Sequence, residues 1–476
     1  MSSLARPVRA VALAACALCL VGGCAGGDTR ATGTRAAPPV ITGTSGSNCP
    51  DVAFTMRTSV SAAIGTVGII EWTASVPVTG AWIDFGRDPE NYEFQAPVDD
   101  PASDQHRTLL LGMKPATTYS FQIVVERGGE RCTSDVERIT TGPLRNGLAT
   151  VVVDTPRPEE AFGGFTIACQ FMPPGPTSLG DPGSFGWAFI FDGDGDIVWW
   201  HRGRATQGCS RARMSYDGKY LWTGNTNVGA TAGGTLARVQ MDGTGEESFD
   251  IPLRHHDFAI LPDESVAYIE YADENLASIP PVLGNEGCDL IKELDPETGV
   301  STTIYEVASA SPTQGGNCHS NAINWWPDEE LYTVSVLYWN SILAFDRSGS
   351  LAWVFGGEMS DFGGVQWDRQ HQHHLFDDHL LLFNNHDDDG NSAALEYQLG
   401  EDSAELVFSY SGGVSSQTFG DVQRLPNGNT LVTFSNAGVI QEVNSSGQLV
   451  QEIRSGLVGY TVRRRSLYGP PPPFAD

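Results

Sequence analysis

From about residue 150 onward the sequence is organised as a weak repeat of paired apolar stretches. Each unit has an apolar stretch, a tight polar turn such as Asp-Gly or Asp-Glu, a second apolar stretch and two further short ones. The clearest copies contain MSYDGKYLWTGN, FAILPDESVAYIEY, NAINWWPDEELYTVSV, HLFDDHLLLFNN and VQRLPNGNTLVTF, and the incomplete unit GWAFIFDGDGDIVWWHR precedes them. Six units of four strands are typical of a β-propeller, so we expect six blades.

Helical periodicity is nearly absent from the chain. Its 54 Gly and 28 Pro interrupt the sequence every few residues, and apolar residues recur mostly at every second position. The expected fold class is all-β: a six-bladed β-propeller over residues 150–468, preceded by a small immunoglobulin/fibronectin-like β-sandwich. A strand from the C-terminal stretch LVGYTVRRRSLY should complete the incomplete unit, which would close the ring and remove exposed sheet edges.

Residues 49–143 are expected to form the sandwich. Their apolar runs are short and alternating, as in VGIIEWTAS and TYSFQIVVERG, and the segment from Leu111 to Tyr119 has the layout of a tyrosine corner. We expect this part to support or space the propeller, because it holds no cluster of reactive side chains. Residues 469–476 form a proline-rich tail without evident chemistry.

The first 24 residues have the layout of an export signal. Arg6 and Arg9 form a basic start, residues 10–20 form an apolar core, and Cys24 follows Val-Gly-Gly as in a bacterial lipoprotein signal. An ordinary signal cleaved nearby is the alternative. Residues 25–48 lack apolar periodicity and are expected to be a flexible linker. We therefore expect an exported protein of the bacterial cell envelope, in the periplasm or on the cell surface, lipid-anchored at Cys24 and attached to the membrane in no other way.

Six cysteines remain after the signal, and an even number in an exported chain points to disulfides. They are Cys49, Cys132, Cys169, Cys209, Cys288 and Cys318. Cys49 with Cys132 is the expected pair, because both fall inside the predicted sandwich. No CxxC spacing occurs among them, so a structural zinc site is not expected. The formal net charge of −30 argues against nucleic acid as a partner.

Three of the ten histidines stand at the start of the innermost strand in three successive repeats: His256, His319 and His371. Innermost strands line the central channel of a propeller, so equivalent positions approach one another there. We therefore expect a functional site in the channel. Three imidazoles could hold a transition metal, or one could act as a nucleophile or proton carrier while the others bind an anion. The spacing does not separate these two chemistries.

Three stretches resemble the ordered motifs of the bacterial arylsulfotransferases, namely RHHDFAILPDE, CHSNAINWWPDEELYTVSVLYWNSILAFDRSGSLAWVFGG and RQHQHHLFDDHLLLFNN. The resemblance covers roughly residues 150–460. It implies transfer of a sulfuryl group from a phenolic sulfate donor to a phenolic acceptor through a transiently sulfated histidine. It implies no phosphoadenosine phosphosulfate, and no cofactor is expected. The oligomeric state stays open.

The family's functional residues can be carried over by motif. His371 matches the histidine nucleophile, and His256 and His319 match the histidines that hold the sulfuryl oxygens and protonate the leaving phenol. Asn321 matches the asparagine two positions after the second histidine. Two further residues are candidates for substrate binding: His255, and His373, which with the adjacent His374 could instead form a solvated turn.

One position departs from the family pattern. Leu337 stands where the family normally has an arginine, whose guanidinium presents a fixed fork to a sulfate-like anion. A protonated His255 or another arginine could substitute for it. The candidate arginines are Arg211, Arg213, Arg254 and Arg369. Without a substitute, the alternative is a non-catalytic propeller that binds a ligand or a protein, and a third possibility is a three-histidine metal enzyme.

Overall fold

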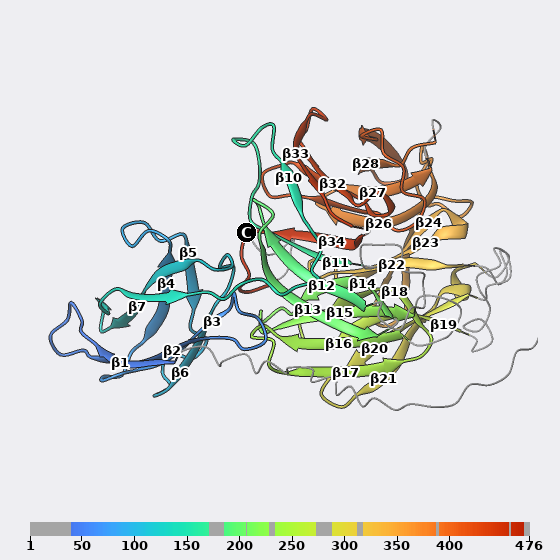
Figure 1. The fold of residues 1–476 in the computed structure, drawn as a ribbon. Coiled ribbons are helices and arrows are strands. Elements are labelled where there is room, and N and C mark those ends of the chain that lie inside the picture. Colours follow the sequence, from blue (N-terminus) through green and yellow to red (C-terminus); the bar gives the residue numbers. More distant parts are fainter. Residues whose placement is uncertain are drawn as a thin grey trace, which may run out of the picture. The chain divides into compact units, whose positions relative to one another are not determined.

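The computed structural model describes residues 40–170, 185–205, 207–227, 234–272, 288–311, 318–386, 390–456 and 458–470. The predicted signal, Cys24, most of the predicted linker and residues 471–476 lie outside this part of the chain. The described residues form strands and three short 3-10 turns, and they contain no α-helix (Figure 1). Consequently no described helix is long and apolar enough to cross a membrane.

Two antiparallel sheets form the N-terminal sandwich. The first has the order β1-β2-β3-β6 and consists of β1 (Ile41–Ser45), β2 (Phe54–Val60), β3 (Gly68–Ala74) and β6 (His106–Leu110). The second has the order β5-β4-β7-β8, with β9 paired to β7, and consists of β4 (Gly80–Gly86), β5 (Phe94–Pro97), β7 (Thr118–Arg127), β8 (Glu130–Thr133) and β9 (Glu137–Thr140). The Lys114 backbone N–H donates to Tyr119 Oη at 2.9 Å, which is the hydrogen bond of a tyrosine corner. Cys49 and Cys132 form a disulfide as predicted.

The sandwich begins before the predicted boundary. β1 lies within the stretch that its composition predicted to be linker, and it pairs with β2 from Ile41 to Ser45. Four of its five residues are exposed. An exposed edge strand has no buried face to impose apolar alternation, so its sequence, ITGTS, carries no strand signal.

Six further sheets are the six predicted blades (Figure 1). The first blade contains β11 (Phe165–Gln170), β12 (Phe185–Asp192), β13 (Ile197–Ala205) and the C-terminal β34 (Val458–Arg464). The second contains β14 (Gln207–Met214), β15 (Tyr220–Asn227), β16 (Gly234–Gln240) and β17 (Glu246–Ile251). The third contains β18 (Arg254–Ile260), β19 (Val266–Tyr271), β20 (Asp289–Asp295) and β21 (Val300–Glu306).

The fourth blade contains β22 (Ser320–Trp326), β23 (Leu331–Val336), β24 (Ser341–Asp346) and β25 (Leu351–Phe355). The fifth contains β26 (Asp368–Phe376), β27 (His379–His386), β28 (Ala393–Leu399) and β29 (Ala404–Tyr410). The sixth contains β30 (Asp421–Arg424), β31 (Thr430–Phe434), β32 (Val439–Val443), β33 (Leu449–Arg454) and the short β10 (Val152–Asp154).

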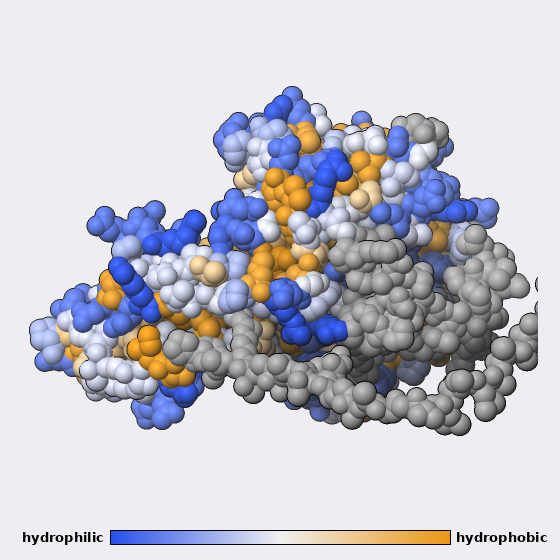
Figure 2. Space-filling view, in the orientation of Figure 1, coloured by the Kyte–Doolittle hydropathy of each residue, from blue (hydrophilic) through white to orange (hydrophobic). Residues whose placement is uncertain are grey.

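The ring is closed by strands from both ends of the propeller segment. β34 pairs with β11 as the innermost strand of the first blade, which confirms the predicted C-terminal completion. β10, at the other end, pairs with β33 in the sixth blade. Buried aliphatic and aromatic side chains from neighbouring blades pack together, as in the cluster that contains Ile269, Val334 and Phe345. Figure 2 shows mainly hydrophilic residues on the visible described surface, with apolar ones interspersed.

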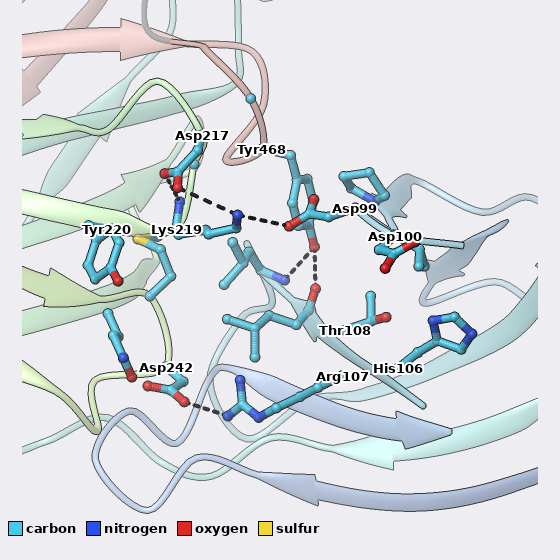
Figure 3. Close-up of a pocket in the computed structure, with 18 of the residues that line it drawn as sticks. Asp99, Asp100, His106, Arg107, Thr108, Asp217, Lys219, Tyr220, Asp242 and Tyr468 are labelled. Atoms are coloured by element: carbon cyan, nitrogen blue, oxygen red, sulfur yellow. Dashed lines mark hydrogen bonds and ion pairs between the residues drawn. The ribbon is translucent and has the colours of Figure 1, made fainter. Parts of the chain in front are cut away.

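Polar contacts connect the sandwich to the propeller strands. Thr66 Oγ1 donates to the Val198 carbonyl at 2.6 Å, and Tyr468 Oη donates to the Leu109 carbonyl at 2.9 Å. A cavity of about 510 Å³ is lined by residues from both parts. Figure 3 shows Lys219 between Asp99 and Asp217 at this cavity, with Nζ–Oδ2 distances of 3.4 and 3.6 Å. None of the three predicted channel histidines lines it.

One contact between sandwich and propeller concentrates charge. Lys114 Nζ lies 3.1, 2.6 and 2.8 Å from carboxylate oxygens of Asp192, Asp194 and Asp196 in the turn between β12 and β13. The lysine side chain is only 18% exposed. Its ammonium therefore neutralises much of the repulsion among three neighbouring carboxylates.

We expect Lys114→Met to lower the free energy of unfolding by about 2 kcal/mol, because it leaves three carboxylates facing one another in a partly desolvated turn. Urea unfolding at low salt measures this loss. Lys219→Met is the matched control: its ammonium also contacts two aspartates, but the side chain is 56% exposed, so we expect a change below about 0.5 kcal/mol. Equal losses in the two variants would contradict the role given to Lys114.

Candidate active site

The structure brings His256, His319 and His371, which occupy equivalent repeat positions, close to one another. The ring centroids of His256 and His319 lie 4.8 Å apart, and those of His256 and His371 lie 6.2 Å apart. His256 is on β18, His319 directly precedes β22, and His371 is on β26. Three successive inner strands thus supply one imidazole each.

Local backbone irregularities aim these side chains at the channel. The ladder shifts register between Arg254 and Phe258 in β18, and again at the start of β22 and within β26. Such bulges are a common device for redirecting a side chain next to a functional site. His256 and His319 also have positive φ angles, 53° and 51°, which cost about 1–3 kcal/mol each in a residue other than glycine. The fold therefore retains strain at two of the three imidazoles.

A hydrogen bond to Asn385 determines which nitrogen of His371 is available. His371 Nδ1 lies 2.6 Å from Asn385 Oδ1. The Asn385 amide nitrogen donates to the carbonyls of Ser416 and Phe419 at 2.6 and 2.7 Å, so its oxygen must be the acceptor. His371 therefore carries its proton on Nδ1 and keeps the lone pair on Nε2. Burial lowers the pKa of His371 to about 3, so the ring is neutral at physiological pH.

A second chain of hydrogen bonds orients His256. His255 Nε2 lies 3.2 Å from Asp289 Oδ1, and His255 Nδ1 lies 2.8 Å from His256 Nδ1. Because the carboxylate accepts from Nε2, the other nitrogen of His255 accepts from His256 Nδ1. The available nitrogen of His256 is therefore also Nε2. Burial, followed by the neighbouring His319 ring, lowers the pKa of His256 well below its usual 6.5.

Asn321 connects three inner strands rather than pointing at the imidazoles. Its Nδ2 donates to the Gln370 carbonyl at 2.8 Å, and its own carbonyl accepts from Tyr460 Oη at 2.5 Å. Gln370 directly precedes His371, so the amide of Asn321 supports the backbone beside that histidine. Its buried Oδ1 has no partner in the described part of the chain.

Leu337, at the family's arginine position, begins a 3-10 turn over Leu337–Trp339. Its backbone N–H donates to the His319 carbonyl at 3.2 Å, and the ring of the next residue, Tyr338, lies 5.6 Å from the His319 ring. The turn therefore supports His319 through its backbone and an aromatic ring. It supplies no cation.

Arg254 is the best candidate to replace the family's arginine. It contacts His256, and it has no carboxylate partner among the described residues. It donates to the carbonyls of Asn225 and His256 at 3.2 and 3.3 Å, and among the described residues it forms no ion pair. Burial lowers its pKa to about 10, so it stays charged at neutral pH. By contrast, Arg211 is paired with Asp257 and Asp421.

The two other candidate arginines are less suited to the site. Arg213 contacts Asp257 Oδ2 at 3.4 Å and donates to Asn324 Oδ1 at 2.9 Å. Arg369 is exposed. Arg254 is therefore the arginine whose charge is best placed to act on the imidazole cluster.

The two residues predicted to bind substrate lie in different places. His255 belongs to the cluster, with its ring centroid 5.0 Å from that of His256. His373 does not, because its Nε2 lies 2.6 Å from Thr333 Oγ1 and the residue lines a separate cavity that includes none of the three histidines. His373 and His374 are both buried, so the alternative of a solvated turn is wrong.

Ligand geometry does not favour the metal alternative. In the described part of the chain, two groups have all their ligand atoms within 4.8 Å of one another, and the three histidines are not among them. These groups are Cys49/Glu130/Cys132 and Asp192/Asp194/Asp196. The first contains a disulfide, and Lys114 already contacts the three carboxylates of the second.

Disulfides hold two of the inner strands near the site. Cys288 pairs with Cys318, and the residues that follow them are Asp289 and His319. Cys169 pairs with Cys209 and so links β11 to β14. Three disulfides are consistent with an exported protein.

Sequence reasoning missed Asn385 and Asp289. Asn385 is the second asparagine of Phe-Asn-Asn at the end of the apolar part of β27, and Asp289 directly follows a cysteine. A polar residue that ends an apolar strand next to the site was the available signal for Asn385. Nothing in the sequence around Asp289 distinguishes it from the many other acidic residues.

Fold and site together define a six-bladed β-propeller whose inner strands bring three imidazoles together, with His371 buried and His256 and His319 half-buried. Residues 289–456, about a third of the chain, match the family model described as Arylsulfotransferase (ASST). This part of the chain is therefore similar to the arylsulfotransferase family, as its motifs predicted. The match includes His319, Asn321 and His371, and His256 precedes it.

Among curated proteins, none matches the chain in sequence. Similar solved structures include a protein of unknown function from Bacteroides caccae, with 14% identity over 62% of this chain and 97% of that chain and a TM-score of 0.39. A putative 6-phosphogluconolactonase from Bacteroides fragilis shows 12% identity over 73% and 94%, with a TM-score of 0.40. The periplasmic gluconolactonase of Pseudomonas aeruginosa shows 14% identity over 72% and 94%, with a TM-score of 0.38. Scores this low carry no argument about this chain.

The hydrogen bond to Asn385 predicts one tautomer for His371. In protein with ¹⁵N-labelled histidine rings, we expect Nδ1 of His371 to be protonated and Nε2 to be unprotonated. Asn385→Leu removes the acceptor and should yield a mixture of tautomers. Asn384→Leu removes a neighbouring amide that does not contact His371, and it should leave the signals unchanged. A protonated Nε2 in the unsubstituted protein would contradict the assignment.

Proposed function

We propose that the protein transfers a sulfuryl group from a phenolic sulfate ester to a phenolic acceptor through a sulfohistidine at His371, without phosphoadenosine phosphosulfate. One observation carries the proposal: a neutral, buried imidazole whose Nε2 is left with its lone pair by the bond to Asn385, beside two further imidazoles. A neutral imidazole nitrogen is a competent nucleophile toward sulfur. The family match supports the same class of reaction.

In the first half-reaction, the Nε2 lone pair of His371 attacks sulfur and forms an N–S bond. The bond between sulfur and the phenolic oxygen breaks, and its electron pair leaves on that oxygen. The phenolate then takes a proton from His256 or His319. Binding of the anionic donor favours a protonated His256, and the Asp289 carboxylate stabilises that positive charge through His255.

In the second half-reaction, the acceptor phenol gives its proton to the same imidazole as its oxygen attacks sulfur. The N–S bond breaks, and its electron pair returns to Nε2 of His371. The proton donor of the first half-reaction is thus the base of the second, and no net proton is consumed. Nδ1 of His371 keeps its proton, which is hydrogen-bonded to Asn385 Oδ1, throughout the reaction.

The surroundings suit an aryl sulfate. Arg254 supplies positive charge next to His256, where it would stabilise the sulfuryl oxygens. The ring of Phe419 lies 5.7 Å from that of His256, and Tyr338 lies 5.6 Å from His319. These aromatic faces are apolar partners for a phenolic ring.

We also propose that the chain is lipid-anchored at Cys24 in the bacterial cell envelope and that its sandwich is of the fibronectin type. The signal-like residues 1–24 and the cysteine after Val-Gly-Gly support the anchor. The tyrosine-corner bond supports the sandwich type.

We expect protein lacking the signal to transfer sulfate from 4-nitrophenyl sulfate to phenol. Donor alone should leave a histidine-linked sulfate at His371, detected by mass spectrometry of peptides kept at alkaline pH. His371→Ala should lower turnover by at least about 10³-fold, since it removes the nucleophile.

His374→Asn is the matched control. It removes another buried neutral imidazole while keeping an acceptor for the backbone N–H of Arg424. We expect nearly unchanged turnover. No transfer together with no histidine-linked sulfate would end the proposal.

The second candidate function is a non-catalytic propeller that binds an anionic or aromatic ligand, and Leu337 is the observation that favours it. Leu337→Arg distinguishes the two. If the protein is a sulfotransferase, the added guanidinium beside His319 should raise turnover by about 10-fold or more. If the variant binds aryl sulfate in calorimetry but remains without turnover, like the unsubstituted protein, the binding function is favoured.

A further inference from the structure

A small cavity, separate from the imidazole cluster, is lined by residues of the inner strands. Its volume is about 60 Å³. Its walls come from the inner strands β14, β22, β26, β30 and β34, and they include Arg211, Arg213, Asn324, His373, Asp421 and Thr461. Sites for aryl ligands are typically several times larger, so this cavity is not a place for a phenolic substrate.

His373 presents an unpaired donor among these residues. His373 Nε2 lies 3.4 Å from Asn324 Nδ2, and because an amide nitrogen can only donate, Nε2 is the acceptor. Thr333 Oγ1, which accepts from the Trp326 indole N–H at 2.7 Å, lies 2.6 Å from the same Nε2 and can donate its own proton to it. The ring proton of His373 therefore lies on Nδ1. This nitrogen is buried and has no hydrogen-bond partner in the described part of the chain.

Other hydrogen-bond donors in the wall of this cavity also lack acceptors. Arg213 Nε and Trp325 Nε1 are buried and lack hydrogen-bond partners among the described residues. Arg211 Nε also lacks one, because its ion-pair partner, Asp257 Oδ1, lies 3.6 Å away, beyond hydrogen-bond distance. Each buried donor left unpaired costs about 1–3 kcal/mol. Four such groups around one small cavity indicate a missing acceptor.

The nearby carboxylates do not accept hydrogen bonds from these four nitrogens, because their oxygens face other donors. Asp421 accepts from the backbone N–H groups of Val422 and Thr461 at 2.9 Å each, and from Arg211. Asp257 accepts from the backbone N–H of Phe258 at 2.8 Å and from Gln372 Nε2 at 2.9 Å. The hydrogen-bond donors without acceptors are therefore the four nitrogens of the cavity lining.

An anion would accept hydrogen bonds from these unpaired donors better than water would. The cavity has room for a few water molecules or for one halide ion, since one water needs about 10–15 Å³ of space open to its centre. Each water would bring two donors of its own to a wall that already presents four donors without acceptors, whereas an anion only accepts. Two guanidinium groups and one carboxylate, that of Asp421, line the cavity, so positive groups outnumber negative ones in its wall. Burial together with the charge of Arg211 lowers the pKa of Arg213 to about 10, and Arg213 stays charged at neutral pH.

We infer that this cavity binds a small monovalent anion of chloride size, held by the Nδ1–H of His373 and the unpaired N–H groups of Arg211 and Arg213. The inference is independent of sulfuryl transfer. The net charge of −30 repels anions from the molecule as a whole, so binding here would have to come from these local donors.

Thermal unfolding at constant ionic strength tests the inference, with sodium bromide replacing sodium isethionate, whose anion is too large for 60 Å³. We expect bromide to raise the melting temperature in a saturable way, as a ligand specific for the folded state does. Crystals grown in bromide should show an anomalous peak in the cavity. Equal melting temperatures in both salts would overturn the inference. A peak without saturable stabilisation would mean an adventitious ion only, and would overturn it equally.

His373→Gln is the diagnostic variant, because the glutamine amide can replace Nε2 toward Thr333 while no donor replaces Nδ1. We expect the half-saturating bromide concentration to rise about 10-fold. His106→Gln, at a buried histidine of the sandwich that does not line this cavity, should leave it unchanged. If His373→Gln fails to fold, Trp325→Phe removes another unpaired donor, with Trp82→Phe in the sandwich as its control. Bromide affinity that is unchanged in the folded variant would exclude the assigned donors.

Discussion

Closure of the ring by strands from opposite ends of the propeller segment is the constraint on which the channel depends. β34 pairs with β11 in the first blade, and β10 pairs with β33 in the last. Without these pairs, two blades would expose unpaired edges and could separate. Only a closed ring brings the inner strands of all blades to one axis. The approach of His256 to His319 and His371, at 4.8 and 6.2 Å, is therefore a consequence of pairing between strands almost 300 residues apart.

A layer of buried charge divides the channel. Arg211 is paired with Asp257 and Asp421, and the Tyr460 ring lies 5.4 Å from its guanidinium carbon. Burying these charges is costly, and the cost is offset because the carboxylates also accept backbone N–H groups. On one side of the layer lie the imidazoles, of which His256 and His371 keep Nε2 available. On the other side lie donors that lack acceptors, so one channel offers two different chemical environments.

The position of His373 illustrates why neighbouring residues in one motif separate. An inner strand runs along the channel, and two residues advance about 7 Å along it. The bulge between Gln370 and His373 further changes the direction of the side chains. His371 therefore lies with the imidazoles, whereas His373 lies beyond the charged layer. The sequence motif RQHQHHLF, which contains both histidines, does not show that they lie in different parts of the channel.

Alternation, turn residues and repetition determined from the sequence alone that the chain is all-β, that its larger part is a six-bladed propeller, and that His256, His319 and His371 share a channel. These properties depend on local patterns and on the repeat, and both can be read directly from the sequence. The tertiary structure alone decided which nitrogen of each imidazole is available, that Asn385 and Asp289 determine this, and that Arg254 lies beside the cluster while Leu337 offers no charge. The reason is physical: a hydrogen bond between residues on different strands depends on register and ring closure, and neither leaves a local trace in the sequence.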